Sequence, residues 1–116
     1  MSLEKRTKKF SLAAIRLFES LLKSPAGQII GKQMLRSATS VGAQYQEARR
    51  ARSKAEFAAK IGGSIQELAE TIYWFELIEE ANLASGDIVK VLRQEANQLM
   101  AMFVASSNTV KAGSSC

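Results

Sequence analysis

The chain has 116 residues, of which 47% are hydrophobic, and it carries a formal net charge of +5. This length supports one hydrophobic core, and the apolar fraction is sufficient to build it without disulfides or metal ions. The sequence has no histidine and a single cysteine, Cys116, which excludes an intrachain disulfide, a zinc site that uses histidine, and Ser-His or Cys-His nucleophile pairs.

The first predicted element is a helix over residues 3–23. Arg16 and Glu19 interrupt its apolar run, so we expect a mature helix rather than a signal peptide. Its predicted core positions follow helical spacing, with the last three widening the stripe: Phe10, Ala14, Leu17, Phe18, Leu21, Leu12, Ile15 and Leu22.

Ser24 and Pro25 predict the start of a second helix. Serine can cap the first turn, and proline loses nothing at the first helical position because its missing N–H would have no partner there. The helix should end near Ala51, among arginines that complement the negative end of the helix dipole. Its predicted core stripe is Ile30, Met34, Ala38, Val41, Tyr45 and Ala48.

A third helix is predicted to start after Ser53. Ser53 and Glu56 form a capping box, in which the serine accepts from the Glu56 N–H and the Glu56 side chain reaches back. Gly62 and Gly63 lie inside a strong helical period, so we interpret them as a close-packing site rather than a turn. The predicted core stripe is Phe57, Ile61, Ile65, Leu68, Ile72 and Phe75.

The helical pattern breaks near Asn82, and Ser85 to Asp87 offer a cap for a fourth helix that fades near Ser106. Its core positions are Ile88, Leu92, Ala96, Leu99 and Phe103. Short connections between long helices favour antiparallel neighbours. We therefore predict an all-α fold, an antiparallel up-down-up-down four-helix bundle over residues 1–111, followed by a flexible tail over 112–116.

Charge divides the chain into two unlike halves. Residues 1–60 hold 13 basic and 4 acidic residues, a net +9, whereas residues 61–116 carry a net −4. The basic half could meet a polyanion, or the two halves could neutralise each other within the bundle or between subunits. Charges recur too often for a membrane span, and the lone cysteine suits a reducing compartment, so we expect a cytoplasmic protein.

Two polar strips predict contact with a partner. On the second helix, Arg36, Ser40 and Glu47 lie roughly opposite the core stripe, beside small residues. On the third helix, a strip of small and acidic residues lies away from the core. The predicted oligomer interface consists of Arg36, Ser40, Glu47, Lys60, Gly63, Glu67, Glu70 and Trp74. An ordinary solvated surface is the alternative, and Trp74 is more typical of packing than of a ligand cage.

Catalysis is disfavoured, and we predict no catalytic residues, no metal and no cofactor. Glu67 and Glu70 have the spacing of helix neighbours, but an acid and base pair would need a buried, water-poor pocket to tune one pKa. Exposure or salt bridging of both side chains would count against this reading.

Nucleic-acid binding is the favoured partner prediction, through sequence-independent phosphate contacts. The candidate residues are the basic ones near the first helix start and the second helix end: Lys5, Arg6, Lys8, Lys9, Arg49, Arg50, Arg52 and Lys54. They have no interleaved aromatic residues, so base-specific recognition is not expected. The same residues could simply solubilise helix ends, and a protein-interaction scaffold without nucleic-acid affinity is the alternative function.

The middle of the chain resembles a known family. Residues 30–48 read Ile-Gly-Lys-Gln-Met-Leu-Arg-Ser-Ala-Thr-Ser-Val-Gly-Ala-Gln-Tyr-Gln-Glu-Ala, and residues 70–76 contain Glu-Thr-Ile-Tyr-Trp-Phe-Glu. These segments are similar to the bacterial four-helix bundles named after proteins encoded in intervening sequences of 23S ribosomal RNA, over about residues 8–104. The resemblance implies a homopentameric ring. A related branch looks like the accessory proteins of diversity-generating retroelements, which bind nucleic acid and reverse transcriptase.

The family's recurrent polar positions fall on residues of the two strips. They correspond here to Arg36, Ser37, Ser40, Glu47, Lys60, Glu67, Glu70 and Trp74. Gln44 stands where the resemblance implies an asparagine, so a hydrogen bond that needs the shorter amide is not expected in this chain. Resemblance of this kind supports fold and assembly more strongly than activity.

Overall fold

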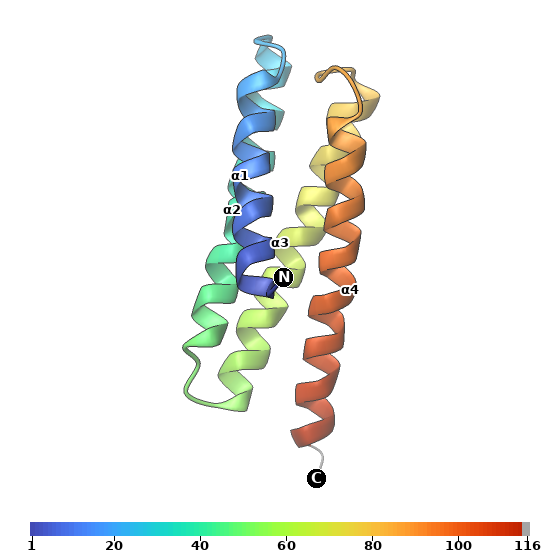
Figure 1. The fold of residues 1–116 in the computed structure, drawn as a ribbon. Coiled ribbons are helices and arrows are strands. Elements are labelled where there is room, and N and C mark those ends of the chain that lie inside the picture. The colour runs from blue at the N-terminus through green and yellow to red at the C-terminus, as the bar shows by residue number, and fades with distance from the viewer. Residues whose placement is uncertain (115–116) are drawn as a thin grey trace.

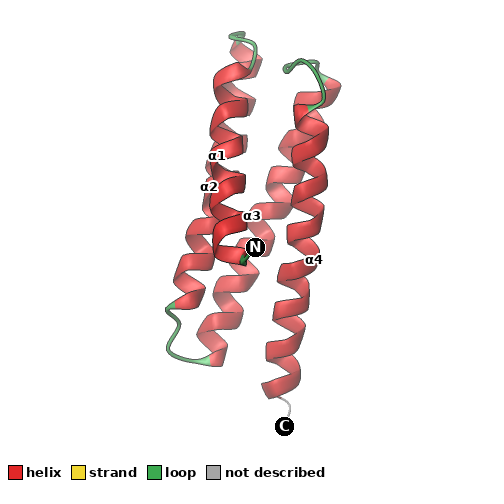
Figure 2. Cartoon of the chain, in the orientation of Figure 1, coloured by secondary structure: helices red, strands yellow, loops and turns green. Residues whose placement is uncertain are grey.

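Four helices make up the structure, a computed structural model that describes residues 1–114. They are α1 (Leu3–Ser20), α2 (Pro25–Arg49), α3 (Lys54–Glu80) and α4 (Ile88–Ser114). Successive helices run in opposite directions, with α1 and α2 on one side of the bundle and α3 and α4 on the other (Figure 1). Short loops join them (Figure 2), and residues 1–114 form no strand. The predicted all-α four-helix bundle is confirmed.

Serine caps begin the first three helices. Ser24 Oγ accepts from the Gly27 N–H at 3.1 Å, and Ser53 Oγ accepts from the Glu56 N–H at 3.1 Å, both as the sequence predicts. The return bond of the capping box differs from the prediction. Glu56 Oε2 accepts from the N–H of Arg52, at 3.3 Å, one residue before the cap. Glu56 therefore satisfies a donor of the preceding loop rather than that of Ser53.

Helix boundaries differ from the prediction at three ends. Leu21 adopts an extended backbone, so α1 stops at Ser20 and not at residue 23. The second helix ends two residues earlier than predicted, at Arg49. The last helix continues past Ser106 to Ser114 and so includes residues 112–114, whereas residues 115–116 of the expected tail lie outside the described residues.

The loop between α3 and α4 contains two residues in the left-handed backbone region. They are Asn82, with φ of 55°, and Gly86, with φ of 73°. Asparagine and glycine tolerate this conformation better than other residues, which explains why the helical pattern breaks here. The Leu22 N–H donates to the Leu83 carbonyl at 2.9 Å, tying the α1–α2 corner to this loop.

Every helix contributes large side chains to one core. Phe10 and Phe75 meet edge to face with ring centroids 6.1 Å apart, and Tyr45 and Phe103 do so at 5.7 Å. The core stripes of α2 and α3 are buried or half-buried as predicted. Within residues 1–114, no helix has the length and apolar content needed to cross a membrane.

The predicted core is wrong at four apolar positions. Leu12, Ile15 and Leu22 are 46%, 38% and 56% exposed, and Ile88 is 42% exposed while its neighbour Val89 is buried. The reason is the position of α1, which packs mainly against α2 and only weakly against α4. A helix that packs closely against only one of its two neighbours buries a narrow stripe, so the residues beside that stripe remain in solvent.

Candidate interaction surfaces

The polar strips predicted on the second and third helices meet along the seam between α2 and α3 of one chain. The Arg36 guanidinium pairs with Glu67, at 3.1 Å between Nη1 and Oε2, and with Glu70. The hydrogen bond that Arg36 donates to Glu70, assisted by the charge of Glu67, raises the pKa of Arg36 above its ordinary value. Farther along the seam, Lys60 Nζ lies 3.5 Å from Glu47 Oε2. These charges pair inside the chain, and their contact with a second copy stays a prediction.

Buried hydroxyl groups lie beneath these ion pairs. Thr71 Oγ1 lies 2.8 Å from Ser37 Oγ, and Ser64 Oγ donates to the Val41 carbonyl at 3.0 Å. Ser64 and Thr71 were not predicted as seam residues. Their seven-residue spacing, with both on the core side of α3, is the signal that could have identified them. The hydroxyls let α2 and α3 pack closely while their polar atoms remain satisfied.

The remaining strip residues support the seam in different ways. Ser40 Oγ donates to the Arg36 carbonyl of its own helix at 2.7 Å. A Cβ added to Gly63 would lie 2.8 Å from Gln44 Oε1, so this glycine does allow close packing, as predicted, whereas Gly62 has nothing within 4 Å. The ring of Trp74 packs against Tyr73, and its buried Nε1 has no hydrogen-bond partner among the described residues.

Glu67 and Glu70 do not form the pocket that acid and base catalysis would require. Both carboxylates bind the Arg36 guanidinium, and their side chains are 23% and 36% exposed. Both side chains are therefore salt-bridged and in contact with water, which counts against the acid and base reading. Within residues 1–114, no group of three or more histidine, cysteine or acidic side chains is placed to hold a metal ion.

The eight predicted phosphate-binding residues do not form one cluster. Arg6 turns toward α4, where it pairs with Glu95 and donates to Gln98 Oε1 at 3.1 Å. Lys9 lines a groove between α1 and α4. Arg49 pairs with Glu4 of α1, at 2.6 Å between Nη1 and Oε2. Arg6 and Arg49 therefore tie helices together, and their charges are largely neutralised.

Exposed cations gather instead at the connection between α2 and α3. Arg50, Arg52 and Lys54 are exposed, and none belongs to an ion pair within residues 1–114. A shallow depression of about 370 Å³ lies at this end, lined by Glu47, Arg50, Arg52, Glu56 and Lys60. We call the three unpaired residues the basic end of the bundle. The nearest aromatic residue in sequence, Phe57, is half-buried against the core.

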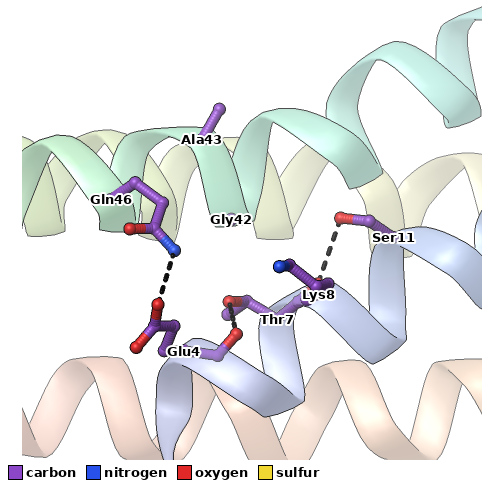
Figure 3. A pocket seen from close by; sticks show the side chains of 7 residues that line it. All are labelled: Glu4, Thr7, Lys8, Ser11, Gly42, Ala43 and Gln46. Carbon is purple, nitrogen blue, oxygen red and sulfur yellow. Dashed lines mark hydrogen bonds between the residues drawn. The ribbon is translucent and has the colours of Figure 1, made fainter.

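A second depression, of about 260 Å³, lies between α1 and α2. Figure 3 shows Glu4 and Gln46 pointing toward each other across it, with Gly42 on the α2 side; the lining is completed by Thr7, Lys8, Ser11 and Ala43. The Gln46 amide donates to Glu4 Oε1 at 3.4 Å. This bond, together with the charge of Arg49, holds the pKa of Glu4 below its ordinary value. The contact places the start of α1 beside the end of α2.

Comparison with known proteins identifies relatives by sequence and by fold. The family model described as 23S rRNA-intervening sequence protein matches residues 2–105. A crystal structure of a protein with unknown function from the S23 ribosomal protein family of Bacteroides thetaiotaomicron superposes with a TM-score of 0.85. It is 24% identical, and the alignment covers 91% of this chain and 98% of that one. No curated protein matches the chain.

Proposed function

We propose that this chain, which belongs to the 23S rRNA-intervening sequence protein family, binds nucleic acid through phosphate contacts and performs no catalysis. The observation that carries the proposal is the basic end of the bundle. Its cations, Arg50, Arg52 and Lys54, are exposed and lie outside the ion pairs of residues 1–114. In contrast, Arg6, Arg36 and Arg49 of the basic half form ion pairs with acidic residues of the same chain. A surface that keeps its positive charge in this way suits a polyanion.

Binding at this end would be driven by charge and not by base identity. Each guanidinium or ammonium group that contacts a phosphate releases condensed counterions, which makes the affinity fall steeply with salt. Half-buried Phe57 offers no free ring on which bases could stack. The exposed Lys5 extends the positive charge from the start of α1, which the Glu4–Arg49 contact holds next to the end of α2.

Self-assembly is the second part of the proposal. The family resemblance implies a homopentameric ring, and a closed ring would repeat the basic end around its axis. Several subunits could then contact one nucleic acid, and linked weak contacts gain affinity through effective concentration. A cytoplasmic location, where thiols stay reduced, also belongs to the proposal.

A binding titration tests the nucleic-acid part. Fluorescence anisotropy would follow labelled duplex DNA and a structured RNA with wild type and with Arg50→Ala/Arg52→Ala/Lys54→Ala at low and moderate salt. We expect the variant to bind roughly tenfold more weakly or worse, because three phosphate contacts are lost.

The matched control is Arg16→Ala/Lys23→Ala/Lys90→Ala, which removes the same charge from exposed positions elsewhere in the bundle. It should bind nearly as well as wild type. Absence of wild-type binding at low salt, or equal weakening by the two triple variants, would show that the basic end is not a nucleic-acid site.

The alternative function is a protein-interaction scaffold, and the exposed apolar residues of α1 and of its connection to α2 favour it. Leu12 and Leu22 are 46% and 56% exposed. A scaffold should capture its partner at high salt without nucleic acid, because apolar contacts are not screened by ions. Co-purification of a protein at about 0.5 M salt would support this alternative, because the Debye length is already only about 10 Å at roughly 0.1 M.

A further inference from the structure

An apolar surface remains open along α1 and the corner that follows it. Leu12 and Ile15 lie about one turn apart, so helical geometry places them on one side of α1, and Leu22 follows in the connection to α2, after the helix ends at Ser20. They are 46%, 38% and 56% exposed. Three large aliphatic side chains on α1 and its connection to α2 leave more apolar surface in solvent than a single exposed residue does.

Positive charge borders this apolar surface, together with one acid, Glu19, which lies on the same side of α1 one turn after Ile15. Lys8 lies one turn before Leu12 and lines the depression between α1 and α2. On α2, Lys32 and Gln46 are separated by two seven-residue steps and so share a side of the helix, and Gln46 contacts α1. Lys32 therefore lies on the α1 side of α2. We call Leu12, Ile15, Leu22, Lys8 and Lys32 the α1–α2 face.

The outer surface of α3 has the opposite charge. Residues 61–89 contain no lysine or arginine and six acidic residues. Glu67 and Glu70 pair with Arg36, and Glu79 pairs with Arg93, so Glu76 and Glu80 are the acids of this part of α3 outside the ion pairs of the described residues. Tyr73, on this helix, is 54% exposed, and Ala69 and Glu80 are exposed as well. Helical spacing places these three residues on the side of α3 that faces away from its buried positions Leu68, Phe75 and Ile61. We call Ala69, Tyr73 and Glu80 the α3 face.

The two faces lie on opposite corners of the bundle. Direct helix contacts join α1 to α2, α2 to α3, α3 to α4 and α1 to α4, which leaves α1 and α3 diagonal to each other. One copy can therefore offer its α1–α2 face to one neighbour and its α3 face to another at the same time. Contacts of this head-to-tail kind close into rings or continue as filaments.

We infer that the α1–α2 face of one copy docks on the α3 face of a second copy. The aliphatic side chains of the first face cover Tyr73 and Ala69 of the second, and Lys8 and Lys32 approach Glu80, an exposed acid outside the ion pairs of the described residues. The inference rests on the self-assembly part of the proposed function and is independent of nucleic-acid binding.

Complementary variants test this pairing of faces. Leu12→Glu/Leu22→Glu places acids on the α1–α2 face, and Tyr73→Lys places a cation on the α3 face. Size exclusion with light scattering should show wild type as an oligomer and each variant alone as a monomer, with circular dichroism reporting an unchanged helical content. Val104→Glu is the matched control, because Val104 is an exposed apolar residue of α4, 41% exposed, outside both faces; it should assemble as wild type does.

An equimolar mixture of the two variants gives the decisive result. The first variant retains an intact α3 face and the second an intact α1–α2 face, so the mixture should form complexes that contain both chains in equal numbers. This gain of assembly also shows that both variants are folded.

Three outcomes would overturn the inference. They are a mixture that stays monomeric, a Tyr73→Lys variant that still assembles by itself, and a wild type that is monomeric at micromolar concentration. In the first two the wild type still assembles, so the faces are wrong while self-assembly stands. A monomeric wild type would remove self-assembly from the proposed function as well. Nucleic-acid binding would then be tested separately by the anisotropy titration.

Discussion

Two glycines of the bundle should respond in opposite directions to the same added methyl group. Gly27 is buried in the first turn of α2, and a Cβ built there lies 2.1 Å from the Leu22 carbonyl oxygen, a backbone atom that cannot turn aside. Gly62 lies inside α3, and a Cβ there has nothing within 4 Å. Both substitutions gain the helix propensity of alanine over glycine, about 1 kcal/mol. Only Gly27→Ala must also move the corner between α1 and α2.

At Gly27 the steric clash outweighs the gain in helix propensity, so the substitution should be destabilising. Overpacking costs about 1–3 kcal/mol, and a backbone contact this short falls at the upper end, so Gly27→Ala should lower the free energy of unfolding by roughly 1–2 kcal/mol. Gly62→Ala should raise it by about 0.5–1 kcal/mol. Since 1 kcal/mol corresponds to about 4 °C for a chain of this size, the two melting temperatures should differ by roughly 6–12 °C.

Urea unfolding and thermal melts followed by circular dichroism measure both changes. A Gly27→Ala protein as stable as wild type would show that α1 does not turn into α2 as described. A destabilised Gly62→Ala protein would show that this position of α3 is covered or not helical.

Three further substitutions test the seams of the bundle. Thr71→Val removes the buried hydroxyl that meets Ser37 and should cost about 1 kcal/mol in urea unfolding, whereas no loss would mean that the hydroxyl contact contributes nothing. Arg36→Glu places a third carboxylate beside the two that Arg36 now binds, and should destabilise the chain by roughly 1 kcal/mol at low salt and less at high salt. The lowered pKa of Glu4 implies a stabilisation that is present above its ordinary pKa of 4.5 and is lost as the pH falls through the lowered value. Glu4→Gln should therefore flatten the pH dependence of unfolding below about pH 4.5, and an unchanged profile would contradict the role of this carboxylate.

Local signals in the sequence were sufficient to predict the helices. Ser24 and Ser53 cap their helices through the predicted atoms, because a serine cap needs only its own first turn. The core stripes of α2 and α3 follow from spacing alone, since both helices are flanked on two sides. Leu12 and Ile15 were assigned wrongly to the core because the sequence does not show that α1 has little contact with α4.

The charged residues were harder to predict because their partners are distant in the sequence. Arg36 lies 34 residues from Glu70, and Arg6 lies 89 residues from Glu95. Composition identified a basic half and helical spacing identified two polar strips, but neither could show which charges would be neutralised within the chain. Only the structure separates Arg49, which pairs with Glu4, from its unpaired neighbours Arg50 and Arg52.

The salt dependence of binding tests the central claim most directly. For duplex DNA, the logarithm of affinity falls against the logarithm of salt with a slope of about 0.9 per phosphate contact, so three cations at the basic end imply a slope of about 2.7 per bound subunit. We predict that Arg50→Ala/Arg52→Ala/Lys54→Ala reduces the slope by about this amount. The Arg16→Ala/Lys23→Ala/Lys90→Ala control should keep the wild-type slope. A wild-type affinity that does not change with salt, or a slope that both triple variants share with wild type, would contradict phosphate binding at the basic end.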